Sequence, residues 1–590
     1  MDESLKEKGI LVFGSGAQAA RAAARCAPST TDSGSLEVRR KLRIAVFADS
    51  PLQPSWVVEG FAKVAASDFA EVVAVVEDSA TPRALPWLLR AYGRVDSRLF
   101  GSQPDPSERI DLKSGVPHIR SLTLPDRDAR QAVIAASRAE FTRLRLDVAF
   151  ALGDVDDRVL EGVAKYGVWR YCFGEGRGSL ETVAGFREVI AGAPVTASGL
   201  KVRRGAAEER LVYQSWSRTF PFSVARNRAN LLRKTAEFAA RALRELHRSG
   251  EAWLEQCAPV VCVPPGPGGG TPGTAEIIRG LSRLGGRIAH RGLQKLLCVD
   301  QWFLAYRFRR TDERGRNDVR RFTRLMPPKD RLWADPFPIE RDGRHFVFFE
   351  ELVFATGKAH IAMVELGRNG ACSNPIQVLE RDYHLSYPFL IDFDRQLWMI
   401  PETGENRTVE LYRCIDFPNR WRLEKVLLRD AWFVDATIHR TDDRWWMFVN
   451  VGVEGGEAHD ELHLYYADHL LGEWKPHHCN PVKSDVRCAR PAGQLYRRDG
   501  ILYRPAQICA PLYGSGILIN RVLQLSPQAY LEQEVERILP LQPEGLLGIH
   551  TLNRAGELTV VDGFMRRPRV GQWDPGASME RAEDPLYLRA

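Results

Sequence analysis

The stretch Ala334-Asp335-Pro336-Phe337-Pro338-Ile339 recurs in altered form along the second half of the chain. The later copies begin at Ser386, Val434, Ala489 and Ile549. The second positions of successive copies are 52, 48, 55 and 60 residues apart. A period of this size indicates one supersecondary unit that is repeated and stacked.

Each copy continues into a turn and then into an apolar strand. The turns are Asp342-Gly343, Asp394-Arg395, Asp442-Asp443, Asp499-Gly500 and Ala555-Gly556. The strands after them are Phe346–Phe349, Leu397–Ile400, Trp445–Val449, Leu502-Tyr503 and Leu558–Val561. Two strands joined by an Asp/Gly turn form a hairpin, and five such units predict a five-bladed β-propeller. We expect Trp302–Arg307 to supply the strand that closes the last blade, and most of the 14 Trp to pack between blades.

The first strand of a blade lines the central channel of a propeller, so the repeat also predicts a site. The copies bring Asp335, Tyr387, Asp435, Arg490 and His550 to that channel, with His384 nearby. The second strands end in Glu350, Glu402, Asn450, Gln507 and Asp562. Charged groups are costly to bury without partners, so a polar binding mouth explains them better than blade structure alone.

The first half of the chain predicts a different fold class, a doubly wound α/β sheet. Arg43–Ala48, Val72–Val76 and Asp147–Gly153 are apolar runs typical of buried parallel strands, with a helix over Trp56–Ala66 between the first two. A longer helix is expected over Val224–Ser249, with its arginines on a solvated face.

Composition places the boundaries between these parts. Pro264–Gly273 is too rich in Pro and Gly for a helix or strand and predicts a linker. We therefore expect a flexible leader over 1–40, the α/β domain over 41–250, a linker and helix over 251–298, the propeller over 299–567 and a tail over 568–590.

Charge and hydropathy narrow the functional class. The net charge of +7 over 590 residues is a weak field without a concentrated basic stripe, which argues against nucleic acid. No apolar run is long enough for a transmembrane helix or a signal peptide, and the ten Cys lack disulfide or zinc spacing. We expect a reduced, cytoplasmic protein without a metal site.

The first half resembles the folate-dependent formyltransferases. The motifs that carry the likeness are Leu146–Ala149 with Gly153, Tyr166–Trp169, Gly176-Arg177-Gly178, Gly185–Glu188 and Gly192–Thr196. The resemblance implies 10-formyltetrahydrofolate as a cofactor and an Asn-x-His pair at the positions of Arg170 and Cys172, with a later acid near Glu208 or Glu209. Arg cannot act as a general base, so this chain departs from the family's chemistry. Formyl transfer is therefore expected to be lost.

The second half resembles the N-terminal region of glucosamine inositolphosphorylceramide transferases and their bacterial relatives. The strings are Trp333–Phe337, Tyr383–Pro388, Ile400–Thr403, Val434–Thr437, Ser484–Gly493 and Tyr503–Gln507. It is also similar to arabinanase-type propellers, whose base and modulating carboxylates match Asp335 and Asp435. The acid of that family has no clear counterpart, and Glu402 or Glu350 could replace it.

Three functions follow as hypotheses. In the first, a protein of cell-surface glycan or glycolipid synthesis binds a sugar, a sugar phosphate or a glycolipid head group. Its catalytic candidates are Asp335, Glu402 and Asp435, and its binding candidates are His384, Tyr387, Arg487, Arg490, Arg504, Gln507 and His550. Arginines suit a phosphate or uronate substituent. The alternatives are an N-formyltransferase acting on a nucleotide-linked aminosugar, and a non-enzymatic docking module of a glycan-assembly complex. The protein is a transferase if it is active.

Overall fold

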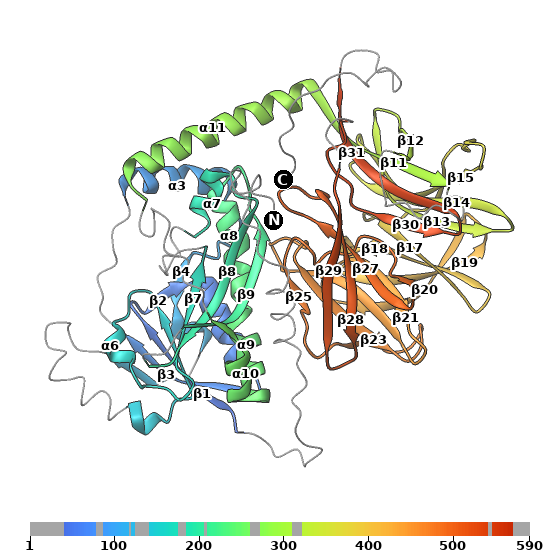
Figure 1. Cartoon of the computed structure of the whole chain (residues 1–590). Helices are drawn as coiled ribbons and strands as arrows, with labels where there is room; N and C mark the ends of the chain where they lie inside the picture. Colours follow the sequence, from blue (N-terminus) through green and yellow to red (C-terminus); the bar gives the residue numbers. More distant parts are fainter. Residues whose placement is uncertain are drawn as a thin grey trace.

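The structure, a computed structural model, has an α/β part and a β-propeller joined by one long helix (Figure 1). It describes residues 40–77, 86–116, 120–123, 141–174, 184–205, 209–259, 272–308, 321–540 and 545–569. The predicted leader, most of the Pro/Gly linker, the Gly176–Gly178 motif, Glu208 and most of the tail lie outside these ranges.

The α/β part is built on one eight-stranded mixed sheet. Its order is β10-β9-β8-β7-β6-β1-β3-β5, parallel from β7 to β5 and antiparallel from β7 to β10. The strands are β1 Leu42–Ala48, β3 Ala70–Glu77, β5 Arg120–Thr123, β6 Val148–Leu152, β7 Val168–Phe173, β8 Val195–Arg203, β9 Arg210–Arg218 and β10 Ala258–Pro259, while β2 Leu52–Pro54 pairs with β4 Arg109–Asp111. The three strands expected from the apolar runs are confirmed. A specifically formyltransferase-like arrangement stays a prediction.

Helices pack on this sheet. They are α2 Ser55–Ala65, α3 Trp87–Phe100, α4 Leu112–Gly115, α6 Asp157–Leu160, α7 Phe186–Ala191, α8 Val224–Thr235, α9 Phe238–Ser249 and α10 Glu251–Gln256. The single helix predicted over Val224–Ser249 is wrong, because the chain breaks it into α8 and α9 at Ala236. The carbonyl of Ala236 approaches Gly60 of α2 so closely that a Cβ there would lie 2.8 Å from the oxygen. The break thus lets α2 pack against this segment.

The second part is a five-bladed propeller, as predicted. The first blade is β13 Arg331–Arg341, β14 Arg344–Val353, β15 Ala359–Leu366 and β16 Ile376–Leu379. The second is β17 Ser386–Phe393, β18 Gln396–Thr403, β19 Thr408–Asp416 and β20 Arg420–Arg429. The third is β21 Trp432–Arg440, β22 Trp445–Gly452, β23 Glu461–Ala467, β24 Lys475–Pro476 and β25 Lys483–Ser484. The fourth is β26 Tyr496–Arg498, β27 Ile501–Ile508, β28 Gly516–Leu525 and β29 Tyr530–Ile538.

The fifth blade closes the ring with strands from both ends of the propeller. It consists of β11 Cys298–Phe308, β12 Thr323–Leu325, β30 Leu552–Ala555 and β31 Leu558–Pro568. β11 runs antiparallel to β31 along its whole length, which confirms the closing strand predicted at Trp302–Arg307. At Asp342-Gly343 and Asp499-Gly500 both residues have positive φ, which confirms these two predicted hairpin turns. Such turns match the twist of paired strands.

The two parts meet through charged groups that are largely removed from solvent. Lys234 of α8 lies 2.7 Å from Asp460, and Arg241 of α9 lies 2.6 Å from Glu461 of β23. The expectation that these helical arginines face solvent is therefore wrong for Arg241, which is 16% exposed. A short parallel bridge between Trp216 and Asp485 adds backbone contact.

Candidate functional site

A repeated backbone irregularity aims side chains at the propeller centre. In each of the first three blades the inner strand is bulged at the second position of the repeat. There Asp335, Tyr387 and Asp435 have φ of 51°, 43° and 55°. Positive φ is unfavourable for residues other than glycine, above all for a bulky residue such as tyrosine. Bulges and strained residues of this kind occur next to functional sites, where they redirect a side chain.

The first charged group of the centre is formed by Asp335, His550 and Asp562. His550 Nε2 lies 3.2 Å from Asp335 Oδ1, and His550 Nδ1 lies 2.8 Å from Asp562 Oδ2, in an ion pair without hydrogen-bond alignment. Thr551 donates to Asp335 Oδ1 at 2.6 Å. Burial opposes the charge on His550, but the two carboxylates outweigh it and raise its pKa to about 10. Likewise, burial would raise the pKa of Asp335, yet His550, Thr551 and Arg490 hold it below its usual value.

These three residues are also the group best suited to a metal ion among the described residues. One ligand atom from each lies within 4.8 Å of the others, and all three side chains are buried. A metal needs a neutral imidazole, so a cation would have to displace the proton that His550 shares with the carboxylates. In the structure as it stands, the imidazolium supplies the positive charge between them.

The second charged group is formed by Asp435, Arg490 and Glu402. Arg490 donates from Nε to Asp435 Oδ2 at 2.5 Å and from Nη2 to Asp435 Oδ1 at 3.2 Å, and Nη2 lies 3.5 Å from Glu402. Gln507 donates to Asp435 Oδ2 at 2.8 Å. Burial and the neighbouring Asp435 raise the pKa of Glu402 to about 8, against the effect of Arg490. Glu402 is therefore mostly protonated at neutral pH.

The site opens to solvent at the side of the first two blades. His384 is 32% exposed, compared with 14% for Glu402 and 10% for Arg490. His384 Nε2 lies 3.2 Å from Glu350 Oε1. Although burial lowers it, the pKa of His384 is raised to about 9 by Glu350 and then by the other nearby glutamates. Of these four groups, the charged imidazole of His384 and the carboxyl of Glu402 form the part-exposed rim, whereas Glu350 and Arg490 are buried beside them.

Two further residues of the centre, His459 and Tyr513, lie outside the sequence repeat. Arg490 Nη1 lies 2.9 Å from His459 Nδ1, and its guanidinium lies 4.9 Å from the ring centre of Tyr513. The ring of Tyr513 also packs on His550 at 5.0 Å. Burial and Arg490 hold the pKa of His459 well below its usual value. The imidazole is therefore neutral and accepts a hydrogen bond from Arg490. Both residues lie on loops outside the repeat, so no sequence signal could have indicated them.

The α/β part holds the loop that carries His459. Arg218 pairs with Glu457 at 2.6 Å, and the Glu457 N–H donates to Asn230 at 3.0 Å. Lys234 pairs with Asp460 on the other side of His459. The α/β part thereby contributes to the geometry of the mouth without reaching its centre.

The structure places three predicted binding residues away from any open surface of the mouth. Tyr387 is fully buried, where it accepts from the Gly493 N–H at 2.7 Å and lies 2.8 Å from Thr437 Oγ1. Arg504 is also fully buried and pairs with Glu532 at 2.7 Å. Arg487 pairs with Asp485 and lies over the ring of Trp216, at the contact with the α/β part.

The two formyltransferase-motif positions occupy β7. Arg170 pairs with Asp157 at 2.7 Å, and Cys172 packs beside Gly199 of β8. Burial raises the pKa of the Cys172 thiol to about 11, so the thiol stays protonated at neutral pH. A hollow of about 320 Å³ nearby is lined by other residues, including Arg158, Lys165 and Arg204.

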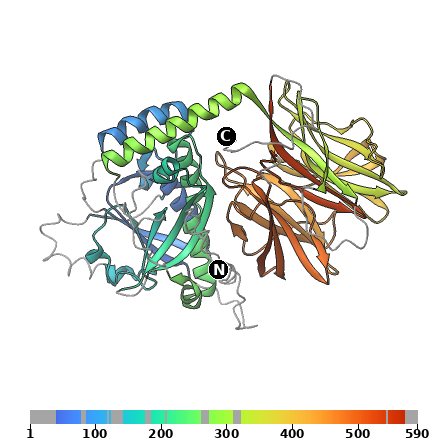
Figure 2. The ribbon, with the colours of Figure 1, turned by 45° about the horizontal axis from the view of Figure 1, so that its top comes forward.

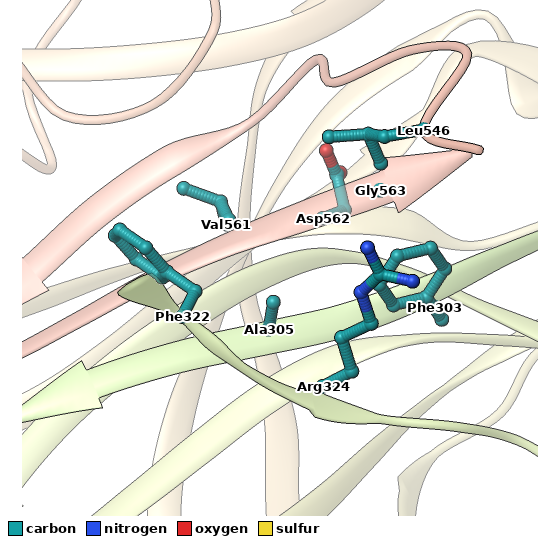
Figure 3. Close-up of a pocket in the computed structure, with 8 residues that line it drawn as sticks. All are labelled: Phe303, Ala305, Phe322, Arg324, Leu546, Val561, Asp562 and Gly563. Atoms are coloured by element: carbon teal, nitrogen blue, oxygen red, sulfur yellow. The ribbon is translucent and has the colours of Figure 1, made fainter. Parts of the chain in front are cut away.

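A small cavity inside the fifth blade is distinct from the mouth. It lies between β11 and β31, with Phe303, Phe322 and Arg324 around it and Asp562 at its edge (Figure 3). Its volume is about 10 Å³. That is room for roughly one water molecule and excludes a sugar.

Fold and mouth together define a five-bladed β-propeller with a buried charged centre and a polar rim. Residues 327–546 match the family described as "Glucosamine inositolphosphorylceramide transferase 1, N-terminal". The protein of that name from Oryza sativa subsp. japonica is 34% identical over 206 residues, which cover 34% of this chain and 28% of the relative. The protein from Arabidopsis thaliana is 33% identical over 228 residues, 38% of this chain and 30% of the relative. The chain thus spans less than a third of either relative.

The solved structures to which the chain shows similarity include glycoside hydrolases. A GH43_1 enzyme from Xanthomonas citri gives a TM-score of 0.30 at 11% identity, covering 40% of this chain and 87% of that one. An alpha-L-arabinofuranosidase from Podospora anserina gives 0.31 at 10% identity, covering 46% and 97%.

Proposed function

We propose that the propeller mouth binds the phosphorylated sugar of a glycolipid head group, or a free sugar phosphate, in the synthesis of cell-surface glycans. The observation that carries this proposal is the part-exposed rim formed by charged His384 and by Glu402, with the buried Arg490 in contact with Glu402. The two cations suit a phosphate, and the carboxyl groups suit sugar hydroxyls or an amine. The name of the matched relatives joins glucosamine to an inositol phosphate lipid, which is the same combination of groups.

We assign binding, and not a transfer step, to this part of the chain. The matched region covers 28–30% of the curated relatives. Recognition of a head group requires only the donors and acceptors of the rim.

Calorimetric titration of the full chain with glucosamine 6-phosphate tests the proposal, with glucosamine and inorganic phosphate as separate arms. We expect H384Q to weaken binding of the phosphorylated sugar by about tenfold, since a hydrogen bond to a charged group contributes roughly 1.5–3 kcal/mol. E402Q, in which an amide replaces a carboxyl that is already uncharged, should weaken it less. The matched control is E365Q, the same change on the outer side of the first blade, where Glu365 pairs with Arg344. Equal affinity in wild type and H384Q would place the ligand elsewhere. Binding of phosphate alone with full affinity would reduce the site to an anion site.

A further inference from the structure

Two helices lie side by side at one end of the molecule. They are α3 and α11 Thr274–Leu297, and Figure 2 shows them along the top edge, with α11 continuing toward the propeller. Leu89 of α3 and Ile277 and Leu284 of α11 share one buried cluster. The inner faces of both helices are thus buried by packing against the α/β part.

Their outer faces carry large apolar side chains in solvent. On α11, Ile278 is 54% exposed and Leu296 is 71% exposed; on α3, Trp87 and Leu99 are 67% and 69% exposed. At roughly 3.6 residues a turn, Ile278 and Leu296 are separated by about five whole turns and point the same way. The other exposed apolar residues of the two helices are Val95, Phe100, Ile288, Leu293 and Leu297. Clustered exposed apolar surface of this extent marks an interaction site.

The basic residues of α11 divide between the two faces. Arg287 and Arg291 turn inward, to the Ile190 carbonyl and to Asp300 respectively. Arg279, Arg283 and Lys295 are exposed. The helix therefore presents cations beside its exposed apolar residues.

The acidic residues of the two helices are not available to balance this charge. Glu276 of α11 pairs with Arg187 at 3.0 Å, and Asp96 of α3 is buried and accepts from the Ala225 N–H. The remaining cations of α3 are Arg90, Arg94 and Arg98, all exposed. Apart from Glu276, which is paired with Arg187, the charges that these helices present to solvent are thus positive.

We propose that the exposed faces of α3 and α11, the paired-helix surface, dock on an anionic lipid membrane. Apolar side chains of an interfacial helix insert at the level of the head groups while its basic residues contact lipid phosphates. Positive charge complements the anionic lipids, which attract basic clusters near the surface. Among the helices that the structure describes, none is long and apolar enough to cross a bilayer, so the helices would lie along the membrane.

The docked helix is connected directly to the propeller. β11 begins at Cys298, immediately after α11, and Asp300 of β11 pairs with both Arg291 and Arg566. The paired-helix surface is therefore held to the closing blade by an ion-pair bridge. Membrane docking does not depend on the proposed sugar site, because the apolar and basic residues involved lie outside the mouth.

Flotation of the full chain with vesicles tests this inference. We expect binding to phosphatidylcholine vesicles that contain about one third phosphatidylserine, weak binding to pure phosphatidylcholine, and loss of binding at high salt. The double variants I278S/L296S and R279E/R283E should each lower the bound fraction by roughly tenfold or more, since apolar insertion and charge both contribute. V535S/L539S is the matched control, because Val535 and Leu539 are 47% and 52% exposed on the fourth blade.

Since all these side chains are exposed, the variants should keep the melting temperature of the wild type, which a thermal melt checks. Equal binding to neutral and anionic vesicles, no binding of the wild type, or unchanged binding of I278S/L296S would each overturn the inference. A wild-type dimer in solution that I278S/L296S converts to a monomer would overturn it as well, because the surface would then be a self-interface. The vesicles contain no sugar lipid, so failure here leaves the proposed function standing, and loss of sugar binding leaves this inference standing.

Discussion

The propeller contains two buried groups of charged residues that differ in how well their charges are paired. In the fourth blade, Glu532 lies 2.7 Å from Arg504 and 2.8 Å from Lys483, and Arg504 also donates to the Cys488 carbonyl. Although burial opposes it, the two cations lower the pKa of Glu532 to about 2. At the mouth, by contrast, burial and Asp435 raise the pKa of Glu402 to about 8. One group stabilises every charge it holds, and the other keeps a carboxyl protonated.

The difference separates a structural ion cluster from a candidate site. Two cations surround one carboxylate in the fourth blade, whereas at the mouth Arg490 is shared by two carboxyl groups, Asp435 and Glu402. A perturbed pKa beside a part-open rim favours a functional role, and closed ion pairs favour a structural one. Three predictions test this distinction.

The largest effect is expected from E532Q. Removing the carboxylate leaves Arg504 and Lys483 buried without their anion, and breaking a buried pair typically costs about 3–5 kcal/mol. Urea unfolding should show this loss in the free energy of unfolding at pH 7, with E365Q as the exposed control. Because the pKa of Glu532 lies below its unfolded value of 4.5, wild-type stabilisation from this residue should be lost as the pH falls from 4.5 through 2. A cost below about 1 kcal/mol would show that the cluster is not structural.

An intermediate effect is expected from H384Q on the alkaline side. The pKa of His384 in the folded state, about 9, is above its ordinary value of 6.5, so its stabilisation is complete below pH 6.5 and is lost as the pH rises through 9. Discounted for solvent screening of a part-exposed group, the loss should be on the order of 1 kcal/mol. Melting temperatures of wild type and H384Q, measured between pH 6 and 10, should converge at high pH. Parallel curves would contradict the ion pair with Glu350.

The smallest loss of stability is expected from E402Q. Glutamine mimics the protonated carboxyl, so the free energy of unfolding near pH 4.5 should change by less than about 1 kcal/mol. At pH 7 E402Q should be more stable than wild type, because its folding requires no proton uptake at this position. The raised pKa of Glu402 means that wild-type stability falls as the pH rises from 4.5 through 8, because the unfolded chain gives up this proton first. E402Q should lack that slope in a urea titration across the same range. A large destabilisation by E402Q would make the mouth another structural cluster and remove the comparison.

Much of the propeller could be predicted from the chain, because its repeat and its Asp/Gly turns are local signals. The site was harder to predict from the sequence. Asp335, Asp435, Arg490 and His550 come together in pairs, as the repeat suggested. Arg504 is also an arginine, like Arg490, and stands in a neighbouring motif. Its side chain, however, turns into the blade interior. No one-dimensional pattern distinguishes an arginine that pairs with Glu532 inside a blade from one that pairs with Asp435 at the propeller centre.

The same limit applied to the α/β part. Its strands follow from apolar runs, whereas Arg241 was expected in solvent and instead pairs with Glu461 across the contact between the two parts. Helix periodicity reports which residues share a face, and the partner of that face is set by chain segments about two hundred residues away.

By itself, the sequence determined the number of blades, the closing strand and the residues at the start of each blade, because period, turn chemistry and alternation are properties of neighbouring residues. Only the tertiary structure decided which charges are satisfied, that His459 and Tyr513 complete the centre, and that α3 and α11 turn apolar and basic side chains outward together. Burial and ion pairing depend on distances between segments remote in the chain, and those distances exist only after folding.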